Sequence, residues 1–182
     1  TALMDADIDC PNVGTILGIT EKFTTKESRL IPVEKYGMKI CSMSCFDIGD
    51  KPIIWRGPMI HNALIQFLSS VEWGDVKYLI VDMPPGTSDA ALTMLQFFDL
   101  DAIIAVTTSH TLSLEDATRT LRMAQSFNKQ IGIVENMTGD VFGSGRGREL
   151  AEREKIPFLG AVPFSKIIAD SANNEKPAIE NE

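Results

Sequence analysis

The sequence is short of cysteine, of basic residues and of long apolar runs, and each shortage excludes a class of protein. Three cysteines in 182 residues are too few for the disulfide framework of a small secreted protein, so we expect a reducing, cytoplasmic setting. No stretch approaches the roughly 18 consecutive apolar residues of a membrane-spanning helix. Seventeen Lys and Arg residues against 25 Asp and Glu residues give a formal net charge of −8, which argues against nucleic acid or anionic lipid as the main partner.

The rest of the composition is that of a globular protein in which strands and helices alternate. Hydrophobic residues make up 44% of the chain, and the length predicts a single domain over residues 1–182. Short apolar runs alternate with amphipathic stretches, which predicts an α/β fold with a doubly wound, mainly parallel sheet whose strands are covered on both faces. The predicted strands are 2–4, 38–43, 78–81, 102–107, 131–134 and 158–162, and the predicted helices lie around 59–68, 90–97, 114–124 and 148–154.

A carboxylate and a stiff turn follow one of these strands. Residues 78–87 read YLIVDMPPGT, so Asp82 lies at the carboxyl end of a strand, where ligands bind in sheets of this kind. A carboxylate there can hold the water shell of Mg²⁺, and the turn formed by Pro84, Pro85, Gly86 and Thr87 suits a loop that senses a phosphate. The alternative is a strand that simply ends at a turn, and the PPGT sequence favours the nucleotide interpretation.

Polar and aromatic residues follow other predicted strands as well. Asp5 and Asp7 are two residues apart, a spacing that points both carboxylates the same way in an extended chain and suits Mg²⁺ with an attacking water. An acidic turn with local hydrogen bonds is the equal alternative. Asn136 offers a donor and an acceptor that could read a purine base, although a loop Asn more commonly satisfies nearby backbone. Pro163 and Phe164 could supply apolar walls to such a base.

The order and wording of these motifs resemble the Mrp family of ATPases, relatives of MinD and ParA. The matching strings, which cover nearly the whole chain, are DADIDCPN, WRGPM, YLIVDMPPGTSDAALT, IVENMTG, FGSGRGRELA and FLGAVPF. The resemblance implies a P-loop NTPase fold and a homodimer that binds and hydrolyses ATP with Mg²⁺. It also implies a role in assembling iron–sulfur clusters or carrying them to client apoproteins.

The same resemblance assigns roles to individual residues. Asp7 would be the switch carboxylate that orders the attacking water, and Asp5 and Asp82 would support Mg²⁺ through water. Residues 84–87 would form the second switch. Asn136 and Pro163 would contact adenine.

Two family features are missing from the printed sequence. The phosphate loop, Lys-Gly-Gly-x-Gly-Lys-Ser/Thr, should precede the DAD motif by one strand-to-helix crossover, so we expect a strand and this loop to be encoded upstream of Thr1. The Gly-rich stretch 143–147 lacks Lys-Ser/Thr and is predicted to ease a turn into a helix. The family's Cys-x-x-Cys between IVENM and FG is absent too. Cys41 and Cys45 remain as weak candidates for a cluster shared across a dimer axis if both are exposed, and otherwise as buried, inert thiols.

Two other functions stay open from the sequence. A MinD/ParA-like positioning or partition ATPase would act on membrane or DNA, but the acidic tail 172–182 lacks the basic amphipathic helix of a membrane anchor. A non-enzymatic regulatory adaptor on the same fold remains open because the Cys-x-x-Cys is missing.

Overall fold

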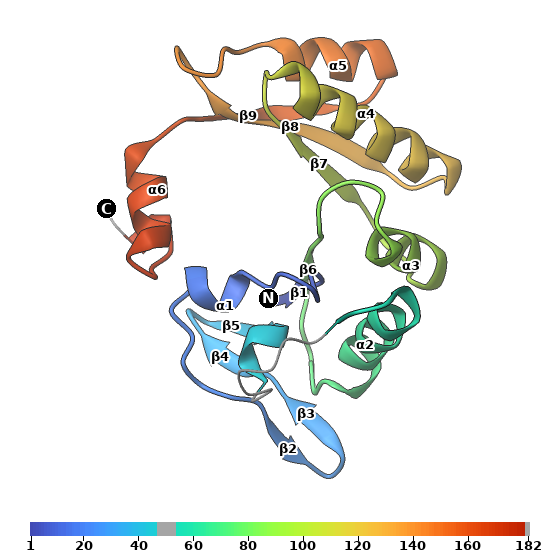
Figure 1. Cartoon of the computed structure of the whole chain (residues 1–182), viewed down its shortest axis with the longest axis vertical. Helices are drawn as coiled ribbons and strands as arrows, with labels where there is room; N and C mark the ends of the chain where they lie inside the picture. The colour runs from blue at the N-terminus through green and yellow to red at the C-terminus, as the bar shows by residue number, and fades with distance from the viewer. Residues whose placement is uncertain (47–53, 181–182) are drawn as a thin grey trace. The chain divides into compact units, whose positions relative to one another are not determined.

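The computed structural model describes residues 1–46 and 54–180, which belong to two compact units. Unit 1 comprises Thr1–Pro84 and Ile167–Glu182, and unit 2 comprises Pro85–Lys166 (Figure 1). Each unit has its own sheet, and a single domain over 1–182 stays a prediction. Within the described ranges, no helix combines the length and apolar character that a membrane crossing requires.

Unit 1 is built on a four-stranded sheet in the order β4-β5-β1-β6. Its strands are β1 (Ala2–Asp5), β4 (Val33–Lys35), β5 (Met38–Cys41) and β6 (Leu79–Asp82). The central strand β1 pairs in parallel with β5 and β6, and β4 pairs antiparallel with β5. Ala2, Met4 and Ile40 are fully buried, so the middle of this sheet lies in the core of the unit.

Unit 1 also contains several helical segments, which precede or follow these strands in the sequence. They are α1 (Val13–Ile16), the 3₁₀ turn η1 (Met43–Cys45), α2 (Gly57–Ser70), α6 (Lys166–Asn173) and the 3₁₀ turn η2 (Ala178–Glu180). Helix α2 begins with Gly57-Pro58, because a proline in the first turn lacks only an amide that has no helical partner. Leu64 and Phe67 on α2 are buried, and Phe67 stacks on Phe46 beside η1 with ring centroids 5.7 Å apart.

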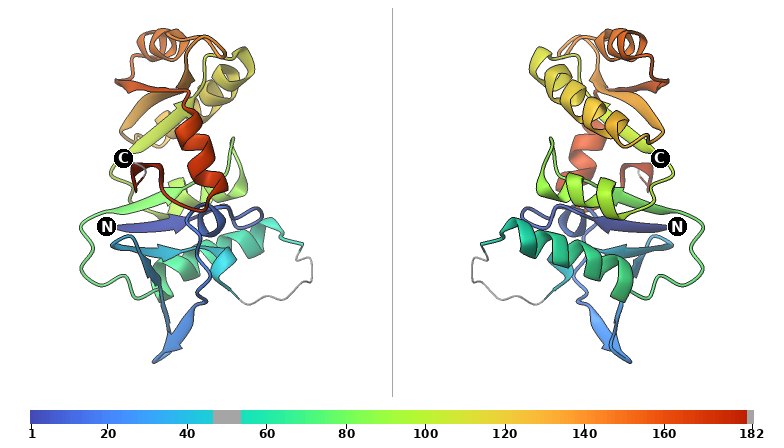
Figure 2. Two further views of the ribbon diagram at one scale, coloured as in Figure 1. Left: turned by 90° about the vertical axis from the view of Figure 1, so that its left-hand side faces the viewer. Right: turned by 90° about the vertical axis from the view of Figure 1, so that its right-hand side faces the viewer.

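A β-hairpin extends away from the sheet of unit 1 in every view (Figures 1 and 2). It pairs β2 (Thr24–Lys26) with β3 (Arg29–Ile31) in antiparallel register. The two residues of its turn, Glu27 and Ser28, have φ of 50° and 66°, the positive values of the tight turn that matches strand twist. The segment 19–36, which is rich in charged residues and threonine, therefore contains this hairpin and β4.

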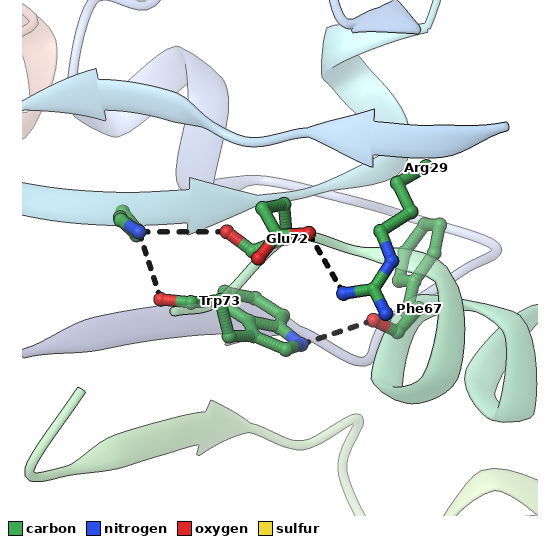
Figure 3. A network of polar contacts seen from close by, with 5 residues as sticks. Arg29, Phe67, Glu72 and Trp73 are labelled. Carbon is green, nitrogen blue, oxygen red and sulfur yellow. Dashed lines mark hydrogen bonds and ion pairs between the residues drawn. The ribbon is translucent and has the colours of Figure 1, made fainter. Parts of the chain in front are cut away.

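A polar network fastens the hairpin to the segment after α2 (Figure 3). Arg29 Nη1 lies 2.7 Å from Glu72 Oε2, and the Glu72 amide donates to the Leu30 carbonyl at 2.8 Å. Lys39 Nζ on β5 donates to the Trp73 carbonyl at 2.8 Å, and Trp73 Nε1 donates to the Phe67 carbonyl at 3.2 Å. Sheet, helix and hairpin are thus joined at one point.

Unit 2 contains a three-stranded parallel sheet in the order β7-β8-β9. Its elements are α3 (Asp89–Phe97), β7 (Ile103–Thr107), α4 (Thr111–Ser126), β8 (Ile131–Thr138), α5 (Arg146–Glu154) and β9 (Phe158–Pro163). Helices α4 and α5 lie together against the sheet (Figure 1). The core between them consists of Ala105, Leu114, Ala117, Leu121, Ile133, Leu150 and Ala151.

Several strands alternate between buried and exposed side chains. On β7, Ala105 is buried whereas Ile104 and Val106 are 59% and 61% exposed, and on β6 Ile80 is 55% exposed. Within the described residues, one face of β6 and of β7 is therefore partly open. In unit 2 the reason is that α4 and α5 pack on the side of Ala105 and Ile133, so the alternating residues point to the other side.

Most predicted elements are confirmed, with shifted ends. Ser88 caps α3 by accepting from the Ala91 amide at 3.3 Å, as its place before the helix suggests. Strand β5 ends at Cys41 because the chain turns at Ser42 into η1, and β8 continues to Thr138. Parallel pairs outnumber antiparallel ones, which confirms a mainly parallel α/β fold.

Candidate functional site

Three predicted carboxylates meet at the carboxyl end of β1 and β6 in unit 1. Asp5 and Asp82 are register partners across the two strands. The Ala6 amide donates to the Asp82 carbonyl at 2.8 Å, so the chain toward Asp7 leaves the sheet beside Asp82. Repulsion from Asp82 adds a small upward contribution to the pKa of Asp5, which burial raises most. The structure therefore brings together the residues for which a magnesium role is predicted.

Asp5 and Asp7 are not equivalent, although they look so in the sequence. Asp5 is only 1% exposed. Its Oδ1 accepts from the Asp7 amide at 3.1 Å, and its Oδ2 accepts from Ser42 Oγ at 2.9 Å and from the Val13 amide at 3.2 Å. Burial raises the pKa of Asp5, and these hydrogen bonds oppose the rise. Protein donors thus occupy both oxygens, so its support of Mg²⁺ stays a prediction and this geometry favours an indirect role.

Asp7 and Asp82 are more open. Asp7 is half-buried, and its Oδ1 accepts from the Cys10 amide at 3.0 Å, which folds the loop after β1 back on itself. Asp82 is exposed as a residue, yet partial burial of its carboxyl group and then repulsion from Asp7 raise its pKa. A carboxylate whose pKa is raised by a neighbouring carboxylate is suited to bind a cation beside that neighbour.

The carboxylates at this strand end fit Mg²⁺ only together with other ligands, such as water and phosphate oxygens. Within residues 1–46 and 54–180, no group of three or more His, Cys, Asp or Glu side chains could hold a metal ion by itself. Mg²⁺ characteristically keeps several waters and binds one or two carboxylates together with substrate phosphates. Asp7 and Asp82 could hold it in that way, and the ion would then supply charge neutralisation for a phosphoryl group.

The predicted second switch is a loop between β6 and α3. Pro84 ends the first stretch of unit 1, and Pro85, Gly86 and Thr87 are exposed at the start of unit 2. Gly86 has a φ of +76°, a left-handed conformation that glycine adopts at no steric cost. The loop ends at Ser88, which caps α3. Its conformation therefore depends on glycine at one point and on a helix cap at its end.

The residues predicted to contact a base lie together in unit 2. Asn136 is half-buried near the end of β8, and Pro163 and Phe164 are exposed at the end of β9. Thr138 of β8 pairs with Pro163, and the Phe164 amide donates to the Thr138 carbonyl at 2.8 Å. The ring of Phe164 lies 5.5 Å from that of Phe142. The structure thus brings these three residues to neighbouring strand ends, in a different unit from the carboxylates.

Beside Asn136, the chain carries a buried acid that the sequence motifs did not single out. Glu135 is 1% exposed, and it accepts hydrogen bonds from the Ser109 hydroxyl, from the Gly145 amide at 3.0 Å and from the Gly147 amide at 3.1 Å. Burial alone raises its pKa, but the bonds from Ser109, Gly147 and Gly145 lower it overall. Glu135 therefore closes the amino end of α5, where a negative charge is favourable.

The Gly-rich stretch 143–147 does what the sequence predicts, since it leads into α5. Gly145 has a φ of +92° and directly precedes the helix. A Cβ on Gly147 would lie 2.8 Å from the Cβ of Glu135, so only glycine permits this approach. A Glu at a strand end followed by closely spaced glycines is the signal that could have identified the contact.

The three cysteines differ in their exposure to solvent. Cys41 and Cys45 are 0% and 1% exposed, whereas Cys10 is exposed. Burial raises the pKa of both buried thiols, and thiolates are the ligands that cluster iron needs. The exposure that a cluster shared through Cys41 and Cys45 requires is therefore not present, and the buried-thiol alternative agrees with the structure.

Comparison with known proteins places the chain among relatives of one family. The family described as "ParA: NUBPL iron-transfer P-loop NTPase" matches residues 1–182. Proteins named iron–sulfur cluster carrier protein from Synechocystis sp. and Rickettsia felis are both 39% identical to it, over 97% and 96% of this chain. The chain spans 55% of the length of each of these relatives.

Solved structures share the architecture. A nucleotide-binding protein from Archaeoglobus fulgidus, in complex with ADP, matches the whole chain and 75% of its own, with a TM-score of 0.82 and 27% identity. The cell division ATPase MinD from Pyrococcus furiosus matches the whole chain and 78% of its own, with a TM-score of 0.71, and at 16% identity shows the fold alone. The chain has the α/β P-loop NTPase fold, and it belongs to the ParA family of NUBPL iron-transfer P-loop NTPases.

Proposed function

We propose that this protein binds and hydrolyses ATP with Mg²⁺, and that it uses this cycle to assemble iron–sulfur clusters or transfer them to client apoproteins. The observation that carries the proposal is the meeting of Asp7 and Asp82 at the carboxyl end of β1 and β6 in a member of this family. The relatives named iron–sulfur cluster carrier support the choice of cargo. A cytoplasmic homodimer is the form in which we propose that it acts.

The residues divide the work according to their surroundings. Asp7, half-buried in a loop, would order the attacking water, and the exposed Asp82 would hold the water shell of Mg²⁺. The turn 84–87 would follow the γ-phosphate, because it joins the end of β6 to the cap of α3. Asn136 would read adenine by hydrogen bonds, with Pro163 and Phe164 beside it as apolar walls. The Gly-rich loop predicted upstream of Thr1 would hold the phosphates through its amides.

The cysteine positions limit how a cluster could be carried. The chain has three cysteines, and two of them are buried. Clusters are normally held by four thiolates, so residues 1–182 of one chain supply too few. A cluster cargo would therefore be bound weakly and between molecules, with ligands drawn from more than one chain.

Single substitutions in the full-length natural protein test the ATPase. Asp7→Ala and Asp82→Ala should each lower magnesium-dependent phosphate release about 100-fold or more, since each removes a group that organises charge in the transition state. Both should leave the circular dichroism spectrum unchanged, because neither side chain is fully buried. Asp101→Ala, at an exposed site in unit 2, is the matched control.

Wild-type rates in both site variants would show that these carboxylates are misassigned. If the unaltered protein releases no phosphate, the ATPase proposal fails, and the result favours the non-enzymatic regulatory adaptor.

A further inference from the structure

A buried serine on a neighbouring strand supports the loop that carries Asp7. Ser42 follows β5 directly and is 0% exposed. Its hydroxyl donates to Oδ2 of Asp5 at 2.9 Å, across 37 residues of sequence. None of the sequence motifs that point to ATP chemistry includes Ser42. Among residues 1–46 and 54–180, Ser42 is nevertheless the one residue whose side chain donates a hydrogen bond to the Asp5 carboxylate.

The direction of the hydrogen bonds around Ser42 is fixed by the number of hydroxyl protons. Ser42 gives its single proton to Asp5, so it can only accept from its other neighbours. Ser44 Oγ lies 2.8 Å away and must therefore donate, and the Ser44 amide donates to the same oxygen at 3.3 Å. Ser44, in the turn after β5, thus donates to the Ser42 hydroxyl oxygen and leaves the Ser42 proton for Asp5.

The turn that carries Ser44 is closely packed against α1. A Cβ on Gly14 in α1 would lie 2.1 Å from Ser44 Oγ, so α1 and the turn are already in close contact. Cys45, next in η1, is 1% exposed. The Ser42 hydroxyl is therefore held in one place by its surroundings.

The Asp5 carboxylate accepts hydrogen bonds from backbone amides at both ends of the loop between β1 and α1. Its Oδ1 accepts from the Asp7 amide at 3.1 Å, and its Oδ2 accepts from the Val13 amide at 3.2 Å at the start of α1. Between these points, the Asp7 carboxylate accepts from the Cys10 amide at 3.0 Å. The backbone position from which the Asp7 side chain projects is consequently set by Asp5.

We propose that Ser42, acting through Asp5, is a positioning residue for Asp7. The pair fixes the Asp7 amide and so aims the Asp7 carboxylate at the end of β1. The catalytic consequence rests on the proposed ATPase function, whereas the structural part does not.

Hydrogen exchange tests the structural part without any activity. In the full-length natural protein, Ser42→Ala removes the one hydroxyl among the described residues that donates to Asp5. Ser69→Ala is the control, because the exposed Ser69 donates its hydroxyl to the Ile65 carbonyl within α2. In Ser42→Ala, amides of the segment 7–13 should exchange about tenfold faster, as expected when local opening becomes easier. Ser42→Thr keeps the hydroxyl and should restore most of the protection. Unchanged exchange in a folded Ser42→Ala variant would overturn the proposal.

Kinetics then test the consequence. Ser42→Ala should lower kcat for magnesium-dependent ATP hydrolysis about tenfold with little change in KM, because Asp7 is assigned to the chemical step and not to nucleotide binding. Combining it with Asp5→Asn should cost no more than Asp5→Asn alone, because Ser42 acts through Asp5. An additive loss, or a change in KM alone, would count against the positioning role.

A variant that fails to fold and an unaltered protein that lacks ATPase activity lead to different conclusions. If Ser42→Ala does not fold, Ser42→Cys, which keeps the volume but replaces the hydroxyl with a weak donor, decides the same exchange experiment. If the unaltered protein shows no hydrolysis, the proposed function fails, while the exchange result still supports or overturns the role of Ser42.

Discussion

The buried contact between Glu135 and the start of α5 makes a quantitative prediction about stability. Glu135 accepts from the Ser109 hydroxyl and from the amides of Gly145 and Gly147. Glu135→Gln keeps the volume of the side chain but replaces one acceptor oxygen with an NH₂ group. Because Gly145 donates to Oε2 while Ser109 and Gly147 share Oε1, either orientation of the amide leaves at least one donor facing another donor.

The size of the effect follows from the number and kind of bonds lost. A hydrogen bond to a charged group contributes about 1.5–3 kcal/mol, and a buried donor left unpaired adds a penalty. The carboxylate also loses its favourable position at a helix start, where a charge contributes about 0.3–1 kcal/mol. The remaining bonds of the glutamine offset part of this loss, so we expect the free energy of unfolding to fall by about 2–3 kcal/mol at pH 7.

Urea unfolding followed by circular dichroism measures the difference, and its pH dependence has a defined sign. The pKa of Glu135 in the folded protein lies below its ordinary value of 4.5. The ionised carboxylate therefore contributes its stability above the unfolded-state pKa, and this contribution is lost as the pH falls through the lower folded-state pKa. The difference between wild type and Glu135→Gln should accordingly be largest near neutral pH and shrink below about pH 4.

Glu152→Gln is the matched control, because Glu152 is exposed on α5, the helix whose start Glu135 contacts. It should change the free energy of unfolding by less than about 0.5 kcal/mol. A loss in Glu135→Gln no larger than in this control, or one equal at pH 3 and pH 7, would refute the reasoning.

Two other predictions concern thiols and a surface ion pair. Under native conditions a thiol reagent should label one cysteine per chain rapidly, the exposed Cys10, while burial and raised pKa protect Cys41 and Cys45; fast labelling of two or three thiols by mass spectrometry would contradict this. Arg29→Ala should lower the free energy of unfolding by less than about 1 kcal/mol in urea, because the side chains of Arg29 and Glu72 are 59% and 44% exposed and water screens the pair. A larger loss that survives 0.5 M salt, about five times the usual 0.1 M reference, would mean that the pair does more than join two surface groups.

The sequence predicts those elements whose signals are local. Strand β7 is an apolar run, and α4 repeats apolar residues at Leu114, Ala117, Leu121 and Ala124, all of which are buried. The hairpin β2–β3 was missed because β2 is polar, β3 has only two apolar residues, and the turn is Glu27-Ser28 instead of a glycine pair. Ser113 and Asp116 have a spacing that resembles a capping box, but α4 begins two residues before Ser113, at Thr111.

Only part of the candidate site could be predicted in the same way. Strand-end acids such as Asp7 and Asp82 are visible because a carboxylate follows an apolar run. The difference between Asp5 and Asp7 is not visible, because it depends on Ser42, which is 37 residues away from Asp5. Glu135 likewise has its partners 10 to 26 residues away. The Ser42–Asp5 contact carries no local pattern, so it appears only once the fold is known, whereas the glycines near Glu135 give a partial signal.

The apolar side chains exposed on β6 and β7 have a practical consequence for handling this polypeptide. Each strand stands at the end of its sheet in the order of the described strands, and Ile80, Ile104 and Val106 are more than half exposed. Exposed apolar side chains of this kind promote association between polypeptides. Preparations of residues 1–182 alone will therefore tend to aggregate as concentration rises, and dilute samples checked by light scattering will be needed before any binding measurement is interpreted.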